Sequence, residues 1–330
     1  MILKNFFEIK NLKQVIIIGF CPNISKIIEI NSKLNLKSLV ITSPNQKKLF
    51  DKNIKVHVFK NLDKKFENFI SKNCKINETL FLSVSSMFVF KKKNISFFNN
   101  NLINYFPSRL PYDTGRGGFS WHIMREDKIL NNSFHIIDED INTGPIIFEE
   151  KKIFPNHCKI PIDYENFKWL EMNSFYEKFI KKIIIKNKFL LSKQSLNIGR
   201  HNPSLNTFKN GFIDWNTNSY DLYNFINAFD EPFMGASTFL NRPGFGRLFL
   251  KNVHLHGGDT NNHPFMTGIV SRHDKKWITV STTGKHMLLI EKVFNSRKIN
   301  IIDKIKPGDR FITPQNILDK SKGLSVIYKP

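Results

Sequence analysis

The sequence predicts a Rossmann-like, doubly wound α/β domain followed by a small antiparallel β-barrel of the OB type. Apolar, β-branched runs recur through the first part of the chain, segments with helical spacing separate them, and short alternating runs follow residue 246. At 330 residues the chain is long enough for two domains that bury a substantial core. We expect the domains at residues 1–191 and 220–330, joined by a linker at 192–219.

The first domain is expected to contain a parallel sheet. Continuous apolar runs, typical of buried parallel strands, occupy residues 14–20, 37–43, 55–60 and 79–85. Helical spacing between these runs is marked by Ile24, Ile27, Ile28, Leu62, Phe66, Phe69 and Ile70. Residues 102–106 and 133–138 are expected to be the last strands, with a helix containing Trp121 between them. Since ligands bind at the carboxyl ends of strands in such sheets, we expect the functional cleft there.

The segments that follow the sheet predict a helix, a loop and a barrel. Residues 175–191 carry an apolar stripe between lysines, which favours an amphipathic helix packed on the core over one lying on a membrane. Residues 192–208 are rich in Ser, Asn, Pro and Gly, as interdomain loops are. Residues 220–229 read as a helix, and the short alternating runs beyond residue 246 predict the antiparallel barrel.

The charge of the chain has two interpretations. Its formal net charge is +22, from 50 Lys and Arg against 28 Asp and Glu, which would suit a polyanionic partner such as tRNA or a nucleotide sugar. The basic residues are mostly lysines among abundant Asn, Ile and Phe, which is also the composition that an A- and T-biased coding sequence produces. No basic block marks a binding face, so charge alone does not identify the partner.

Cysteine and histidine usage predicts neither disulfides nor a metal site. Cys21, Cys74 and Cys158 are too few and too scattered for a disulfide framework, which favours a reduced, cytoplasmic setting. The histidines of the second domain lack the close pairing of metal ligands, so no metal is expected. No run reaches the roughly 7–15 apolar residues of a signal peptide or the ~20 of a membrane span, so we expect a soluble protein without membrane attachment.

Two fragments carry most of the functional information: residues 104–111, NYFPSRLP, and residues 133–145, SFHIIDEDINTGP. Together they resemble the active-site strands of the folate-dependent formyltransferases, whose patterns are roughly Asn-x-His-x-x-x-Leu-Pro and Asp-Glu-x-x-Asp-x-Gly. Phe106 stands at the family's histidine position and Asn142 at its aspartate position. An Ile-Asp-Trp segment at residues 213–215 and a Pro-x-x-Gly-Ala-x-Thr-Phe segment at 232–239 are similar to the methionyl-tRNA formyltransferase branch.

The resemblance implies roles for the residues of the catalytic centre. It implies transfer of a formyl group from 10-formyltetrahydrofolate to a primary amine, with Asn104 donating a hydrogen bond to the oxyanion of the tetrahedral intermediate. Asn104 and Phe106 share one face of their strand. His135 occupies a family position that lines the site. Because an aspartate facing Phe106 would be an unpaired buried charge, the two replacements are expected to accompany each other.

The resemblance also implies positions for the folate and the acceptor. The pterin pocket of the family begins after the fourth strand, at Ser85, Ser86, Met87 and Phe88. Asp138, Glu139 and Asp140 are expected beside the folate and, with His135, are candidates to relay the proton in place of the missing pair. Acceptor contacts are expected from Arg109, Gly115, Arg116 and Gly117. These glycines lack the GxxxxGK[ST] spacing of a phosphate loop, which favours a turn beside the acceptor.

Two functions remain open at this point. The first is a formyltransferase, with full or reduced activity, acting on a small amine such as a nucleotide-linked amino sugar or on methionyl-tRNA. The sequence RLPYDTGRGGFSW at residues 109–121 differs from the usual family loop and favours the small amine. The second is a catalytically inactive member of the fold that binds or regulates, because Phe106 and Asn142 cannot take part in proton transfer.

Overall fold

The computed structural model of the chain describes residues 5–115, 118–186, 188–195 and 198–323. These form two compact units. The first unit contains the described residues within 1–114, 129–153 and 167–200, and the second contains those within 115–128, 154–166 and 201–330. The domain limits expected at residues 191 and 220 remain predictions. Among the described residues, no helix combines the length and apolar character needed to cross a membrane.

A seven-stranded sheet forms the centre of the first unit, in the order β4-β3-β2-β5-β6-β8-β9. Its strands are β2 (Gln14–Gly19), β3 (Lys37–Thr42), β4 (Val56–Val58), β5 (Thr79–Val84), β6 (Leu102–Phe106), β8 (Ile129–Ile136) and β9 (Ile146–Ile153). The strands from β4 to β6 run parallel, whereas β8 is antiparallel to β6 and β9 is antiparallel to β8. The prediction of a doubly wound α/β domain is therefore confirmed. Strand β8 begins earlier than expected, and β9 was not predicted.

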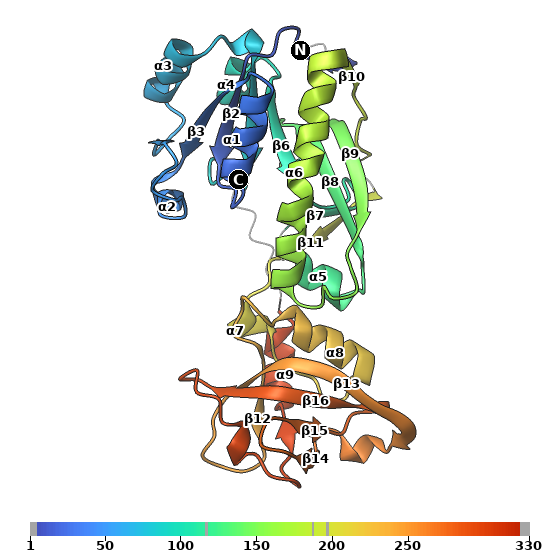
Figure 1. The fold of residues 1–330 in the computed structure, drawn as a ribbon. Coiled ribbons are helices and arrows are strands. Elements are labelled where there is room, and N and C mark those ends of the chain that lie inside the picture. Colours follow the sequence, from blue (N-terminus) through green and yellow to red (C-terminus); the bar gives the residue numbers. More distant parts are fainter. Residues whose placement is uncertain (1–4, 116–117, 187, 196–197, 324–330) are drawn as a thin grey trace. The chain divides into compact units, whose positions relative to one another are not determined.

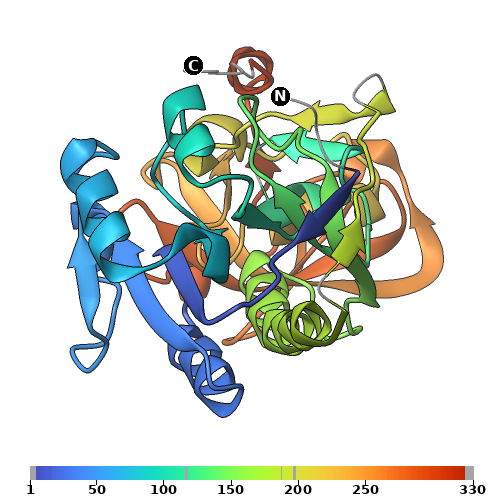
Figure 2. The ribbon, with the colours of Figure 1, turned by 90° about the horizontal axis from the view of Figure 1, so that it is seen from above.

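Helices cover both faces of this sheet (Figures 1 and 2). The apolar residues of α1 (Ile24–Lys33) and α6 (Pro161–Lys186) pack on one face. Those of α3 (Lys64–Asn73), and residues at the end of α4 (Lys92–Phe97), pack on the other. The short helix α2 (Pro44–Lys47) follows β3. Two small ladders complete the described strands: β1 (Phe6–Glu8) pairs with β10 (Lys188–Leu190), and β7 (Asp113–Gly115) pairs with β11 (Arg200–Asn202).

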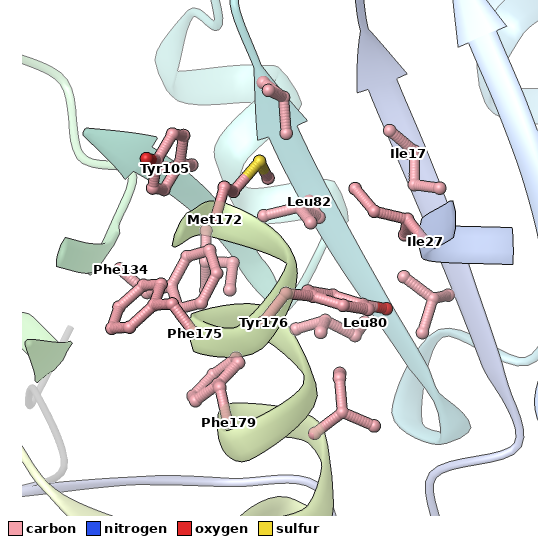
Figure 3. Close-up of a cluster of buried hydrophobic side chains, with 14 of the residues drawn as sticks. Ile17, Ile27, Leu80, Leu82, Tyr105, Phe134, Met172, Phe175, Tyr176 and Phe179 are labelled. Carbon is pink, nitrogen blue, oxygen red and sulfur yellow. The ribbon is translucent and has the colours of Figure 1, made fainter. Parts of the chain in front are cut away.

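The larger core of the first unit lies between the sheet and α6, where aromatic rings fill the space (Figure 3). Phe134 of β8 stacks on Phe175 of α6, with ring centroids 4.7 Å apart, and Phe179 lies one turn further along the helix. The hydroxyl of Tyr176 reaches α1 and donates to Asn31 Oδ1 at 2.6 Å. This aromatic packing fixes β8 and β6 against α6. The sequence predicted only the second half of this helix, which begins at Pro161.

A curled antiparallel sheet forms the second unit, in the order β14-β15-β16-β13-β12-β17. Its strands are β12 (Ala236–Leu240), β13 (Leu248–Asn262), β14 (Val270–His273), β15 (Ile278–Val280), β16 (Gly284–Asn295) and β17 (Phe311–Ile312). An antiparallel bridge between Ile269 and Arg310 links the two edges, and this agrees with the predicted barrel. The helices of this unit are α5 (Gly118–Met124), α7 (Thr207–Asn210), α8 (Ser219–Ala228) and α9 (Gln315–Ser321).

Candidate functional site

The polar residues of the two motifs meet near the middle of the first unit's sheet. Asn104 on β6 lies directly opposite His135 on β8 and beside Ser83 on β5. Because side chains alternate along a strand, Asn104 and Phe106 share one face. Tyr105 points to the opposite face, into the core beneath α6 (Figure 3). The strand register therefore brings the predicted Asn104 and His135 side by side.

The His135 ring is held between two hydrogen-bonding partners. Its Nδ1 lies 2.8 Å from the carbonyl oxygen of Ile136, and its Nε2 lies 3.2 Å from Asn104 Nδ2. A carbonyl oxygen can only accept, so the proton belongs on Nδ1 and the lone pair on Nε2. Nε2 in turn accepts a hydrogen bond from the Asn104 amide. The pair is thus a neutral imidazole that holds a carboxamide.

Burial determines the protonation of this histidine. The side chain is 2% exposed, and the loss of solvation lowers the pKa of His135 from 6.5 to about 4. Hydrogen bonds to the Ile136 carbonyl and to the Asn142 side chain oppose that shift but do not cancel it. The second interaction brings Asn142, at the family's aspartate position, to the same ring. His135 is therefore neutral at physiological pH and a weak base.

Phe106 lies beside this ring but adds no hydrogen-bonding group. Its ring is nearly perpendicular to that of His135, at 81°, with the centroids 6.5 Å apart. Its backbone carbonyl accepts a 2.8 Å hydrogen bond from the Ser133 hydroxyl across the strand pair. Phe106, which stands where the formyltransferase pattern has histidine, therefore adds an apolar wall beside the His135 ring.

The second motif forms a tight loop after β8. Asn142 adopts a left-handed backbone conformation with φ of 61°. The side chain amide of Gln194 donates to the carbonyl oxygens of Asn142 and Gly144, at 3.0 and 2.5 Å. Gly144 packs so closely against the carbonyl of Ile136 that a Cβ atom has no room there. The glycine of the motif is thus required by the same carbonyl that binds the His135 ring.

Asp138 is tied into the same loop. The Thr143 hydroxyl donates to Asp138 Oδ1 at 2.7 Å. Partial burial raises the pKa of the Asp138 carboxyl above its ordinary value, and the hydrogen bond from Thr143 opposes the rise. The neighbouring carboxylates are more exposed, and Glu139 pairs with Lys92 at 3.1 Å. Asp138 is therefore the carboxyl of this loop whose environment favours holding a proton.

The segment predicted to begin the pterin pocket leaves β5 in a strained turn. Ser85 has a φ of 44°, and its carbonyl oxygen accepts a 2.8 Å bond from Gln46 Nε2. The Ser86 hydroxyl accepts from the backbone N–H of Phe88, whose ring packs against the second core of the sheet. Met87 is 57% exposed. These two hydrogen bonds fix the turn at the carboxyl end of β5, and its role in a pterin pocket remains a prediction.

The arginine predicted to contact the acceptor lies in an ionic cluster. Asp113 is 1% exposed, and its carboxylate lies 3.7 Å from Arg109 Nη2 and 2.9 Å from Arg200 Nε. The guanidinium of Arg109 also lies 5.2 Å from the centroid of the Tyr112 ring. Since one carboxylate faces two guanidinium groups, the cluster retains a positive charge, and both arginines are partly exposed.

The remaining acceptor residues fall in the loop around β7. Gly115 has a φ of 96° and approaches the backbone of Asn202 so closely that a side chain has no room. Both the backbone conformation and the close packing therefore favour glycine at this position. Arg116 and Gly117 lie outside the described residues.

Sequence reasoning missed two residues of this region, Gln194 and Arg200. Both fall in the segment expected to be a linker, where no motif marks them. Only the folded chain shows that one holds the Asn142 loop and the other pairs with Asp113. Within the described part of the chain, no group of three or more His, Cys, Asp or Glu is arranged to hold a metal ion.

Comparisons with known proteins identify a family model and a curated protein that are similar to parts of the chain. Residues 207–306 match the family model described as formyl transferase, C-terminal domain. A methionyl-tRNA formyltransferase of Clostridium perfringens (strain 13 / Type A) is 25% identical over 195 residues, which is 58% of this chain and 58% of that protein. The match thus spans little more than half the length of the curated relative.

Solved structures share the fold over most of the chain. WlaRD, a sugar 3N-formyltransferase crystallised in the presence of dTDP and 5-N-formyl-THF, aligns with 87% of this chain and 99% of its own, with a TM-score of 0.58 and 18% identity. An N-formyltransferase from Helicobacter canadensis, in complex with folinic acid and dTDP-3-aminofucose, aligns with 85% and 99%, with a TM-score of 0.59 and 17% identity. Residues 207–306 are thus similar in sequence to the C-terminal domain of formyl transferases, and the chain shares its fold with N-formyltransferases of known structure.

Proposed function

We propose that the protein transfers a formyl group from 10-formyltetrahydrofolate to a primary amine. The observation that carries this proposal is the Asn104 carboxamide, which His135 holds near the carboxyl ends of β5 and β6. In this reaction the amine nitrogen attacks the formyl carbon, and the formyl oxygen becomes negative in a tetrahedral intermediate. An N–H of Asn104 stabilises that oxyanion. The bond from carbon to N10 then breaks, N10 takes a proton, and the amine loses one.

Asp138 is the group we propose for accepting the amine's proton. A general base works best when its pKa is close to the working pH. The low pKa of His135, about 4, and the engagement of its Nε2 lone pair by Asn104 make that ring a poor acceptor. Glu139 is paired with Lys92, whereas burial raises the pKa of Asp138. This assignment replaces the His and Asp of the family pattern with one carboxylate of the adjacent loop.

The folate donor and the acceptor are proposed from separate observations. Two relatives of the same fold were crystallised with 5-N-formyl-THF or folinic acid, which supports a folate donor. For the acceptor we propose a nucleotide-linked amino sugar. Arg109 and Arg200 both face the buried Asp113 carboxylate and together keep a positive charge, which suits an anionic acceptor. Methionyl-tRNA is the alternative acceptor, supported by the Clostridium perfringens relative and by the net charge of +22. We propose a cytoplasmic setting, since Cys21, Cys74 and Cys158 are all free thiols.

A second function, binding without catalysis, is favoured by Phe106 and Asn142. Neither side chain titrates, and loss of a positioned acid or base typically costs about 10²–10⁴ in rate. A protein of this kind would still hold a formyl-folate beside Asn104 without transferring its formyl group.

The test is an assay of the full chain with 10-formyltetrahydrofolate and a panel of amines, including dTDP-amino sugars and methionyl-tRNA, followed by mass spectrometry of the products. We expect one acceptor to gain a formyl group, and the Asn104→Ala variant to lose about 10²–10³ in kcat. The matched control is Asn77→Ala, an exposed asparagine of the same unit, in the short 3₁₀ turn (Ile76–Glu78) just before β5.

If no acceptor is formylated by the natural chain but the Phe106→His, Asn142→Asp variant is active, the protein is a binding member of the family and the enzymatic proposal fails. Salt dependence separates the acceptors: affinity for tRNA falls steeply with salt, whereas affinity for a nucleotide sugar falls little.

A further inference from the structure

We propose that His135 is a positioning residue that fixes which way the Asn104 carboxamide faces. The proposal rests on the proposed function, because it assigns a second residue to the oxyanion site that Asn104 forms. Its consequence is specific: the Asn104 amide directs one N–H to His135 and leaves its other N–H for the formyl oxygen.

The backbone register keeps the two residues together. Asn104 and His135 are direct partners across the antiparallel β6 and β8 pair, and the ladder continues on both sides, from Ile103 and Ile136 to Phe106 and Ser133. Side chains that are directly opposite in such a pair face each other at close range. The contact between Asn104 Nδ2 and His135 Nε2 therefore follows from the sheet itself.

The carbonyl of Ile136 determines the direction of the hydrogen bond. Since this oxygen accepts from Nδ1 at 2.8 Å, the ring carries its proton on Nδ1 and presents a lone pair at Nε2. Of the two polar atoms of the Asn104 amide, only the nitrogen can donate a hydrogen bond to this lone pair. A flipped amide would place its oxygen against that lone pair and would present oxygen, not N–H, on its other side. The tautomer thus selects the one amide orientation that can stabilise an oxyanion.

Burial keeps the ring in this state. His135 is 2% exposed, and burial lowers its pKa to about 4, so the Nε2 lone pair is present throughout the neutral range. The amide of an asparagine has two N–H groups, and the hydrogen bond to Nε2 uses one of them.

The first test is the tautomer, read by long-range ¹⁵N–¹H correlation spectra of the full chain labelled at histidine. At pH 7 we expect a protonated, pyrrole-type Nδ1 and an unprotonated, pyridine-type Nε2 for His135. The assignment comes from the signal that disappears in His135→Gln and remains in His157→Gln, an exposed histidine. A ring that is charged at pH 7, or protonated on Nε2, would overturn the proposal without any measurement of activity.

The second test is kinetic and uses a pair of variants. His135→Leu keeps the bulk but cannot accept a hydrogen bond, so we expect kcat to fall at least about tenfold, while the KM for the folate donor changes by less than about threefold. His135→Gln can accept through its side chain oxygen and should recover part of the loss. An unchanged kcat in His135→Leu, or the same loss in both variants, would overturn the positioning role.

Failure of the proposed function gives a different pattern. If the natural chain formylates no amine, hydrogen exchange of the Asn104 side chain amide, read from its NMR signals, still tests whether His135 positions that amide. Slow exchange of one Nδ2 proton in the natural chain, lost in His135→Leu, supports positioning. Equal exchange in the two proteins rejects it.

Discussion

The buried His135 makes the stability of the first unit depend on pH in a predictable way. Its pKa is about 4 in the folded chain, whereas an unfolded histidine has its ordinary value of 6.5. The unfolded chain therefore binds a proton in this interval that the folded chain does not. By linkage, the contribution of His135 to stability is complete above pH 6.5 and is lost as the pH falls from 6.5 to about 4.

The magnitude follows from the two pKa values. A tenfold change in proton affinity corresponds to about 1.4 kcal/mol, so the interval from 6.5 to about 4 amounts to about 3 kcal/mol. That is a large fraction of the roughly 5–15 kcal/mol that stabilises a typical domain. The perturbation that isolates it is His135→Gln, which removes the titration. Other groups that titrate in this range are common to both proteins and cancel in the comparison.

The assay is hydrogen exchange of β6 and β8 peptides, followed by mass spectrometry across a denaturant series at pH 7 and pH 4.5. It gives the free energy of unfolding of the first unit alone, which matters because a chain of two units need not unfold in one step. We expect the natural chain to lose about 2–3 kcal/mol more than His135→Gln between the two pH values. A His157→Gln control should behave like the natural chain. Equal losses in the natural chain and His135→Gln would refute the assignment of a neutral, buried ring.

Three further predictions concern the loop, the glycine and the core. Asp138→Asn should lower kcat for formyl transfer by about 10²–10⁴ with little change in the donor KM, and steady-state kinetics with an unchanged kcat would exclude Asp138 as the proton acceptor. Gly144→Ala should destabilise the first unit by about 1–3 kcal/mol, because its Cβ meets the Ile136 carbonyl. Hydrogen exchange measures this change in the stability of the first unit, and an unchanged stability would show that the loop can shift to make room for the Cβ atom. Tyr176→Phe should cost about 1–3 kcal/mol in urea unfolding, because it leaves buried Asn31 Oδ1 without its donor; a neutral effect would contradict that accounting.

The fold could be predicted from the sequence wherever strands are wholly apolar. The runs at residues 14–20 and 79–85 were predicted because both faces of the parallel strands that they contain, β2 (Gln14–Gly19) and β5 (Thr79–Val84), are buried. Strand β8 was placed too late because Asn131 and Asn132, both buried, look like loop residues in sequence. Strand β9 was missed because its exposed face carries charged side chains, so that much of it reads as a polar loop.

The candidate site was only partly predictable, for a related reason. The motifs identified Asn104, His135 and Asn142 by chain position, but the register that places Asn104 opposite His135 is a property of the folded sheet. The tautomer depends on the Ile136 carbonyl, and the loop conformation depends on Gln194, which is 50 residues away from Gly144 in the chain. Sequence spacing contains no information about such contacts. The sequence also did not predict that Arg109 lies beside the buried carboxylate of Asp113.

The most direct test is a crystal structure of the full chain with 10-formylfolic acid, a stable donor analogue that carries its formyl group on N10. We predict that Asn104 Nδ2 lies within hydrogen-bonding distance of the formyl oxygen, about 2.7–3.2 Å, while keeping its contact with His135 Nε2. A bound folate whose formyl group lies away from Asn104, or an Asn104 amide turned with its oxygen toward the formyl group, would contradict it.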